Sequence, residues 1–566
     1  MNGRVAWTLM IIGSTVAAWS HAQQPAPIPS TVRPGTIERE QNPPREPQAV
    51  ESGAPLTLKL EQSAPPGNAA QLTFTLQSLE VVNSKAFSSQ DLVASYRNLL
   101  GQTISVQKLY EIAAEMTVRY RKADFLLSTV IVPRQTIDGG HVQLQAVEGY
   151  IAKISVEGDT GRRPGLLQSM QEQVLNDRPL RSTTLERFLL TLNDLPGITA
   201  QGILQPSPDT PGASDLIVRL HASDVGATAG VSNRGSRLQG PVQATSALSL
   251  NDLFGTYDNT SLQYLQAGRG SELRFYSLSN RERLTASGLD ITASATHSQS
   301  DTALGQEFVS SNLQTDDTQG RIELSMPLLR NRARNLYLHG GLTYSNSETD
   351  TFGAALNHDK LAALRLGLDF DVSDAAGGVN VIDFEASKGL NALGASHYGD
   401  PLASRPGGRP DFFKLTSNLA RLQSLGGPFS LLLAVNGQLA FSKVLVAEEF
   451  AYGGEYFGRA YDASELVGDS GIAEKLELRY TLDFSGGFGV TVYGFGEDGK
   501  VWRRITTDIS TPRTDSAVSV GGGIRFSLTR LVSGYVEAAK PTNHIVAAEG
   551  DRRVRVFGGL QFNFSL

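Results

Sequence analysis

Apolar and polar residues alternate with a period of two from about residue 223 to Leu566. In residues 364–371, for example, the even positions are apolar and the odd positions carry Arg, Gly or Asp. This period is typical of β-strands that have one apolar and one polar face. About sixteen such segments occur, one per roughly 21 residues with its connection, which suits membrane-spanning strands of ~9–11 residues.

The last segment, residues 553–566, favours a barrel in a membrane over a soluble β-sandwich. A sandwich also alternates, but it seldom places charges so regularly on one face of long strands joined by Gly-rich turns. In a membrane barrel, closure satisfies the backbone, the lipid face is apolar and the lumen is polar. We therefore expect a transmembrane β-barrel of about 16 antiparallel strands over residues 223–566, enclosing an aqueous channel. The apolar face of the segment comprises Val554, Val556, Leu560, Phe562, Phe564 and Leu566.

Residues 71–222 follow a different pattern, in which the order strand, helix, helix, strand, strand occurs twice. This repeat predicts two small α+β modules, at residues 71–149 and 150–222. In the first module we expect a capped helix from Ser88 and a second helix from Ser105. Its strands are expected at 72–76, 125–132 and 142–146. In the second module the expected strands are 152–156, 198–204 and 216–220, and the expected helices are 166–175 and 184–194.

The N-terminal residues have the pattern of a targeting signal followed by a linker. Residues 1–22 have a positive start, an apolar stretch and a small-x-small ending, which predicts a secretory signal peptide; an uncleaved anchor helix is the alternative. Residues 23–70 are rich in Pro, which forbids long helices and central strands and predicts an extended linker. One short helix, at about residues 36–42, is compatible with this composition.

Composition removes several classes of protein. Hydrophobic residues make up 40% and charged residues 19% of the 566 residues, values that fit neither a polytopic helical membrane protein nor a disordered chain. The net charge of −7 provides no basic field for nucleic acid. Without Cys there are no disulfides, thiolate nucleophiles or Cys-based metal sites. We expect no cofactor and no metal, because no His pair has helical metal-binding spacing.

Two short motifs suggest enzymes but lack the required context. Residues 494–500 resemble a glycine-rich nucleotide loop, yet a strand or turn is expected there instead of a helix N-terminus, so we expect no nucleotide binding. Residues 468–471 (Gly-Asp-Ser-Gly) resemble a serine-protease nucleophile loop, but no His and acid are evidently placed to complete a triad. The chain is therefore expected not to be an enzyme.

One connection, of about thirty residues between strands ending near Phe441 and starting near Ile472, is too long for a hairpin. Its residues 447–471 are rich in Gly and Tyr and contain one cation, Arg459. If residues 488, 490 and 492 face lipid, then the side chains of Tyr493, Phe495 and Glu497 face the lumen. A cation on the loop and an anion on the inner wall suggest that the loop folds inward and docks.

These features together resemble the two-partner secretion transporters, the TpsB or haemolysin secretion/activation family (type V secretion) within the BamA-type superfamily. The resemblance implies that residues 71–149 and 150–222 are POTRA modules and that a plug helix lies near residues 34–42. The family loop motif Val-Arg-Gly-Tyr resembles Gly458, Arg459, Ala460 and Tyr461. The inner-wall motif Phe-x-Asp-x-Gly resembles the segment with Phe495, Glu497, Asp498 and Gly499. The resemblance implies that Arg459 pairs with Glu497 inside the lumen, with Asp498 as the alternative partner if a bulge shifts the register.

The implied function is export of one large, unfolded, cognate exoprotein, of the TpsA type, from the periplasm to the surface of a Gram-negative cell. The modules would capture it by adding its strand to an exposed sheet edge, and the loop would close the channel at rest. Outer-membrane lipid is an expected partner. The barrel assembly machinery is another, for which Phe562, Phe564 and Leu566 form the C-terminal signal. The alternative is a BamA-type factor that inserts outer-membrane proteins, and a passive porin would leave the modules unexplained.

Overall fold

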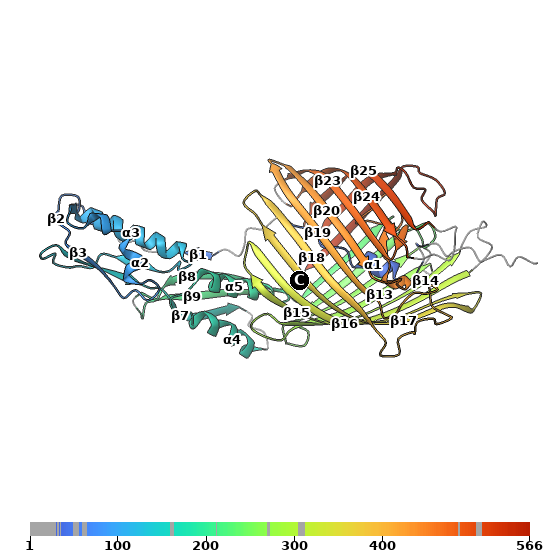
Figure 1. The fold of residues 1–566 in the computed structure, drawn as a ribbon, viewed down its shortest axis with the longest axis horizontal. Helices are drawn as coiled ribbons and strands as arrows, with labels where there is room; N and C mark the ends of the chain where they lie inside the picture. The colour runs from blue at the N-terminus through green and yellow to red at the C-terminus, as the bar shows by residue number, and fades with distance from the viewer. Residues whose placement is uncertain are drawn as a thin grey trace, which may run out of the picture.

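The computed structural model of the chain consists of a β-barrel and two α+β modules at one end of it (Figure 1). The expected signal peptide, residues 1–22, and the last residue, Leu566, lie outside the described residues. The structure describes residues 30, 33, 35–48, 56–58, 65–158, 163–210, 212–268, 272–303, 312–484, 487–504 and 512–565.

Sixteen antiparallel strands form the closed barrel, as the sequence predicted. Each strand pairs with its neighbour in sequence order, and β27 closes on β10, where Phe562 lies opposite Ala229 and Phe564 opposite Ala227. The strands are β10 (Val225–Ser232), β11 (Gln243–Asn251), β12 (Asp258–Ala267), β13 (Leu273–Arg283), β14 (Asp290–Ala303), β15 (Asn312–Arg330), β16 (Arg334–Thr351), β17 (Ala354–Ser373), β18 (Gly378–Leu390), β19 (Phe413–Gly426), β20 (Phe429–Ala440), β23 (Ser470–Asp483), β24 (Gly489–Trp502), β25 (Thr514–Thr529), β26 (Val532–Pro541) and β27 (Arg555–Ser565).

Several strands are longer than the expected ~9–11 residues. The longest, β17, has 20 residues, which at ~3.3 Å per residue is more than a tilted strand needs to cross the hydrocarbon. The excess length carries the strands beyond the membrane. The number of strands was predictable from the alternation, whereas their lengths were not, because polar and apolar residues also alternate outside the lipid.

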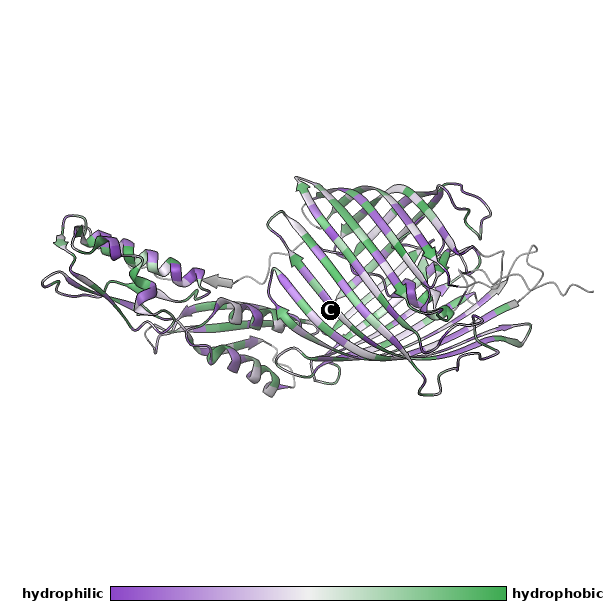
Figure 2. Cartoon of the chain, in the orientation of Figure 1, coloured by the Kyte–Doolittle hydropathy of each residue, from purple (hydrophilic) through white to green (hydrophobic). Residues whose placement is uncertain are grey.

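The alternation in sequence becomes a separation of faces in the barrel. Hydrophobic (green) and hydrophilic (purple) residues alternate along the barrel strands in Figure 2. Leu364, Leu366 and Leu368 are exposed on the outside, Leu366 to 59%, whereas Arg365 between them is largely buried in the lumen. Phe562 and Phe564 of β27 are likewise exposed on the outer face. This arrangement satisfies both solvents, with apolar side chains toward lipid and charges toward the channel.

The first module has a sheet of order β3-β6-β5, with β3 parallel and β5 antiparallel to β6. The side chains of Ser88 and Asp91 form the expected capping box, and Ser105 caps the second helix. The elements are β2 (Thr73–Thr75), β3 (Ser78–Val82), α2 (Ser89–Val93), η2 (Arg97–Leu99), β4 (Thr103–Ser105), α3 (Val106–Lys122), β5 (Thr129–Ile131) and β6 (His141–Val147).

The structure differs from two expectations in this module. The strand expected at residues 72–76 pairs with β4 in a separate two-stranded sheet, and the strand that joins the main sheet is β3. The pattern of Leu92, Tyr96 and Leu99 predicts one helix that continues to a C-cap at Gly101. The helix instead ends at Val93, and a short 3₁₀ turn follows before Gly101, which has a φ of +79°. Leu92 and Tyr96 are still buried, because a broken helix can place the same apolar residues against the core.

The core of the first module includes Tyr120, whose ring packs edge-on against Phe87 at a centroid distance of 4.8 Å. Burial raises the pKa of Tyr120 to about 12. The hydroxyl therefore stays protonated and donates a hydrogen bond to Glu148 Oε1 at 3.0 Å. Glu148 also accepts the backbone N–H of Ala86 at 2.7 Å. These bonds connect α3 to the loop before α2.

The second module repeats the sheet order of the first, with β7 parallel to β9 and β8 antiparallel to it. Its edge strand β8 is paired in parallel with β1 (Leu56–Leu58), a strand of the Pro-rich linker. One sheet edge that the sequence left open is therefore occupied. The elements are β7 (Ile151–Gly158), α4 (Pro164–Leu175), α5 (Ser182–Asn193), β8 (Ile198–Pro206) and β9 (Ser214–Ala222).

The second module contacts one end of the barrel, near the ends of β13 and β15. Asp194, which follows α5, accepts two hydrogen bonds from Arg330 at 2.8 and 2.9 Å. Arg163 pairs with Glu282 at 3.0 Å, and Tyr257 is buried in the apolar core of the module. These contacts fix the end of the barrel from which the modules extend. Within the described residues, no helix has the length and apolar character needed to cross a lipid bilayer.

Candidate gating site in the barrel lumen

The long connection between β20 and β23 folds into the barrel. It contains a 3₁₀ turn, η3 (Val446–Glu448), and a hairpin of β21 (Phe450–Tyr452) and β22 (Leu466–Gly468) that the sequence did not predict. Phe450, Tyr452 and Phe457 of the loop are buried in one cluster with wall residues such as Phe495. The loop is therefore packed against the inner wall by apolar burial as well as by charge.

Arg459, near the tip of this loop, is buried among wall carboxylates. Its Nε lies 2.7 Å from Glu497 Oε1, and its Nη1 lies 2.7 Å from Glu477 Oε2 and 3.1 Å from Glu537 Oε2. The second oxygen of Glu497 accepts the backbone N–H groups of Gly458 at 2.9 Å and Arg459 at 2.8 Å. Glu497 thus binds both the side chain and the backbone of the loop.

The site is buried and aromatic. Arg459 is 3% exposed, and its guanidinium carbon lies 3.5 Å from the centroid of the Phe495 ring. A guanidinium over an aromatic face is stabilised by the ring quadrupole, more so where water is excluded. Phe495 and Glu497 are alternate lumen-facing residues of β24, so one strand supplies both the ring and the carboxylate.

Two glycines, one in the loop and one in the wall, make room for the ring of Tyr452. Gly458 has a φ of +83°, and a Cβ atom there would lie 2.8 Å from the Tyr452 ring. A Cβ at Gly499 of β24 would lie 2.2 Å from the same ring. Tyr452 therefore lies directly over the backbone of the wall strand, and any larger residue at position 499 would displace it.

Ala460 and Tyr461 are buried beside Arg459. The Ala460 carbonyl accepts a hydrogen bond from Arg555 Nη1 at 3.2 Å, and the Tyr461 hydroxyl donates to the Val518 carbonyl at 3.0 Å. Asp498 is the next residue of β24 after Glu497, and its side chain is exposed. In this register Glu497 is the residue that reaches Arg459.

Other members of the site were not identified from the sequence. Glu477 and Glu537 are each 1% exposed, and Arg234 pairs with Glu537 and donates to the Arg459 carbonyl at 3.2 Å. Glu477 also pairs with Arg525 at 2.7 Å. Glu477 stands between Leu476 and Leu478 in the sequence, so the alternation places it on the polar face of its strand. Alternation alone cannot show which lumen charges lie at the same height.

We expect Gly499→Ala to weaken loop docking without preventing barrel formation, because the added methyl group collides with the Tyr452 ring. Overpacking of this kind costs ~1–3 kcal/mol. Channel recordings in planar lipid bilayers should show more frequent opening than in the parent protein. Gly496→Ala on the same strand is the matched control, because a Cβ there meets no atom within 4 Å. Equal behaviour of the two variants would contradict the assigned contact.

A short helix of the linker, α1 (Thr36–Gln41), also lies inside the barrel (Figure 1). Ile37 packs into an apolar cluster of β12 and β13. The backbone N–H of Gly35 donates to Asp317 at 2.9 Å, and Arg39 donates to the loop at Ser464 Oγ at 3.2 Å. The helix is thus held between the wall and the inward-folded loop.

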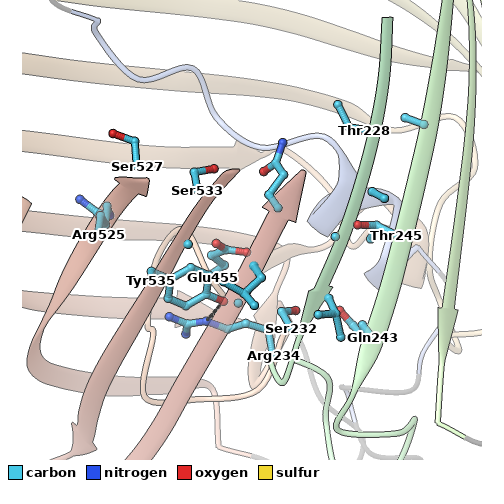
Figure 3. Close-up of a pocket in the computed structure, with 18 of the residues that line it drawn as sticks. Thr228, Ser232, Arg234, Gln243, Thr245, Glu455, Arg525, Ser527, Ser533 and Tyr535 are labelled. Atoms are coloured by element: carbon cyan, nitrogen blue, oxygen red, sulfur yellow. Dashed lines mark hydrogen bonds between the residues drawn. The ribbon is translucent and has the colours of Figure 1, made fainter. Parts of the chain in front are cut away.

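The helix and the loop leave two polar cavities in the lumen. One has a volume of ≈ 790 Å³ and is lined by residues such as Glu40, Arg525 and Tyr535. Figure 3 shows its lining side chains, which come from β10, β11, β25 and β26 and from Glu455 of the loop. The other, of ≈ 770 Å³, is lined by Glu38 and Lys414 among others. Both cavities are lined largely by polar and charged side chains.

The enzyme-like motifs are structural parts of the barrel. Residues 494–500 lie within β24, where no helix N-terminus is available for a phosphate group. In the segment 468–471, Asp469 is buried and accepts a hydrogen bond from Arg405 Nη1 at 2.7 Å. This pair fixes the outer end of the loop to the connection that follows β18.

Comparisons with known proteins agree with this architecture. Residues 212–526 match the family described as haemolysin secretion/activation protein ShlB/FhaC/HecB, and residues 74–149 match the POTRA domain of ShlB type. The chain is 22% identical to the heme/hemopexin transporter protein HuxB of Haemophilus influenzae over 538 residues, 90% of this chain and 91% of that protein. It is 23% identical to the outer membrane transporter CdiB of Dickeya dadantii over 491 residues, 83% of each chain.

Solved structures show the same fold. CdiB from Escherichia coli has a TM-score of 0.72 at 20% identity, covering 91% of this chain and 95% of that one. CdiB from Acinetobacter baumannii has a TM-score of 0.62 at 17% identity, covering 93% and 95%. The family match spans more than half of the 566 residues. The chain therefore belongs to the haemolysin secretion/activation family, whose members are outer-membrane transporters of two-partner secretion.

Proposed function

We propose that this protein exports one large, unfolded exoprotein from the periplasm to the cell surface, through the barrel lumen. The observation that carries this proposal is the obstruction of the channel by two internal parts, α1 and the loop bearing Arg459, inside a closed wall. Both parts can leave the lumen without breaking a strand pair of the barrel. A channel with removable contents suits intermittent passage of a polymer better than constant diffusion of small solutes.

The modules supply the entry point in this proposal. The second module, which shares the sheet order of the first, is assigned as another POTRA module. An unfolded chain would bind by adding a strand to a sheet edge, with backbone hydrogen bonds for affinity and side-chain pockets for specificity. Because β8 is already paired with β1, the incoming strand would use β7 of the second module, or β3 or β5 of the first.

The ion pairs of Arg459 would set the resting state of the gate. A desolvated pair is strongly destabilised by loss of one partner, which costs ~3–5 kcal/mol, so the docked loop is a defined state. Leaving it requires that Glu497 find another partner or water, whereas Glu477 keeps Arg525 and Glu537 keeps Arg234. Binding of exoprotein segments in the lumen would supply that compensation, and folding of the exoprotein outside the cell would then remove the unfolded chain by mass action.

A strain that lacks this protein is expected to lose a single secreted protein from its surface or medium while its other outer-membrane proteins remain at normal levels. Mass spectrometry of the medium and of the outer membrane measures both. General depletion of outer-membrane proteins would instead support an insertion factor of the BamA type. Restoration of secretion by the intact reading frame controls for effects on neighbouring genes.

A further inference from the structure

On the module side of α1, the linker crosses the lumen with two adjacent charges of opposite sign, Arg45 and Glu46. Adjacent side chains of an extended chain point to opposite sides, and here Arg45 reaches β17 and β18 while Glu46 reaches β23. Strands β19 and β20 lie between these two places in the barrel. Asn418 of β19 donates a hydrogen bond to the Arg45 carbonyl at 2.9 Å. The linker is thus held at three points along one arc of the wall.

Three carboxylates meet Arg45. Asp369 stands directly opposite Asp383 in the register of β17 and β18, and Asp371 is the next lumen-facing residue of β17. Like charges directly opposite each other destabilise a sheet. Arg45 Nη1 lies 2.8 Å from Asp383 and 3.8 Å from Asp369, and Nη2 pairs with Asp371. On the other side of Asp369, His339 Nδ1 lies at 3.2 Å. The guanidinium supplies a positive charge that this part of the wall requires.

Glu46 meets the opposite charge. It pairs with Lys475, and Arg479 Nη2 lies 3.4 Å from its carboxylate. Lys475 and Arg479 are lumen-facing residues of β23 on either side of Glu477, whose own carboxylate is engaged by Arg459, Arg479 and Arg525. The wall therefore has an anionic site, which binds Arg45, and a cationic site, which binds Glu46. The two sites are close enough for two adjacent residues of one extended chain to reach both.

Two further observations indicate that this place suits a polypeptide. Asn418 is 6% exposed, and no hydrogen-bond partner for its Oδ1 is found among the residues that the structure describes. A buried amide oxygen of this kind is suited to a peptide N–H. In the same described ranges, no group of three or more His, Cys, Asp or Glu residues is placed to hold a metal ion. The ligand present is itself a polypeptide, residues 45–46 of the linker.

We propose that Asp369, Asp371 and Asp383, together with Asn418 and the pair Lys475 and Arg479, form a binding site for an extended polypeptide with a basic and an acidic residue side by side. Arg45 and Glu46 occupy it at rest and so help to retain α1. An exported chain occupies it after α1 has left; only this second occupant rests on the proposed function. The side chains of Arg45 and Glu46 are 41% and 36% exposed, so the pairs are weak enough to exchange, as transport through a channel requires.

Channel recordings of the full-length protein in planar lipid bilayers test the resting occupant. We expect Arg45→Gln to raise the frequency of open events about two- to fivefold, the range for partly exposed ion pairs. The double variant Asp371→Asn, Asp383→Asn should do the same, and combining all three changes should add little, because they remove one interaction. Gln48→Ala, at an exposed position of the same linker segment, is the control without effect. Unchanged opening, or fully additive changes, would overturn the proposal.

A synthetic peptide of residues 43–48 (Pro-Pro-Arg-Glu-Pro-Gln) tests the site itself. It should reduce the current through the Arg45→Gln channel, and the same peptide with Gln in place of Arg should not. The channel with Arg45→Gln, Asp371→Asn and Asp383→Asn should be insensitive to both. Equal block of the two channels would refute the site. Heat-modifiable migration on gels confirms that each variant barrel is folded. Neither recording uses an exoprotein, so a failure here is separate from a failure of the secretion test.

Discussion

Replacement of Arg459 by alanine is expected to release the loop from the wall and to reduce secretion, because the loop then has no defined docked state in the lumen, while the barrel remains folded. The change removes the cation that Glu497, Glu477 and Glu537 share in a buried site. Loss of one partner of a buried charge pair costs ~3–5 kcal/mol, which corresponds to a shift of the docking equilibrium by about two orders of magnitude or more. Secreted exoprotein in the medium and heat-modifiable migration of the barrel on gels are the measurements.

Arg459→Lys should resemble the alanine variant more than the parent. The guanidinium contacts Glu497 through Nε and the other two glutamates through Nη1, and a single ammonium group cannot reproduce this fork. Arg553→Ala, at a side chain that is 87% exposed, is the matched control and should secrete normally. Normal secretion by Arg459→Ala would show that the docked loop has no role in export.

Leu278→Arg is expected to be the most damaging single substitution on the outer face of β13. Leu278 is 48% exposed near the middle of the strand, and an arginine on the lipid face near the bilayer midplane costs ~2–4 kcal/mol. The amount of heat-modifiable barrel in the outer membrane should therefore fall.

The neighbouring Ser279 provides the control for this substitution. Ser279 lies on the same strand but lines the ≈ 770 Å³ lumen cavity, so Ser279→Arg places the same charge in water. It should leave barrel levels near those of the parent protein. If both arginines reduced the barrel equally, the division into a lipid face and a water face would be wrong for this strand.

The barrel was predictable because its signal is repeated and local. Alternation places every Leu of residues 364–370 on one face without reference to any other strand. About sixteen such segments together predict a closed barrel. The helix starts at Ser88 and Ser105 were equally predictable, since a cap is decided by residues within one turn. The sheet strand β3 was missed because residues 72–76 alternate as well, and only pairing with β6 decides between them.

The site was predictable only in part, because it depends on residues far apart in sequence. The contact of Arg459 with Glu497 was implied by resemblance to a family and by the face of β24. The roles of Glu537 and Arg234 were not visible, since they depend on which lumen side chains lie at the same height after sixteen strands have paired. The location of α1 likewise depends on the wall and the loop, and a six-residue helix has little stability of its own.

The pairing of β1 with β8 has a consequence for how often the channel can be reclosed. Residues 42–55 join α1 to β1, and a segment of that length reaches at most about 50 Å. A displaced α1 stays connected through this segment to the second module and is thus confined to a small volume beside the channel mouth. Its local concentration there is of millimolar order, so resealing after each passage is a fast intramolecular event that requires no additional protein.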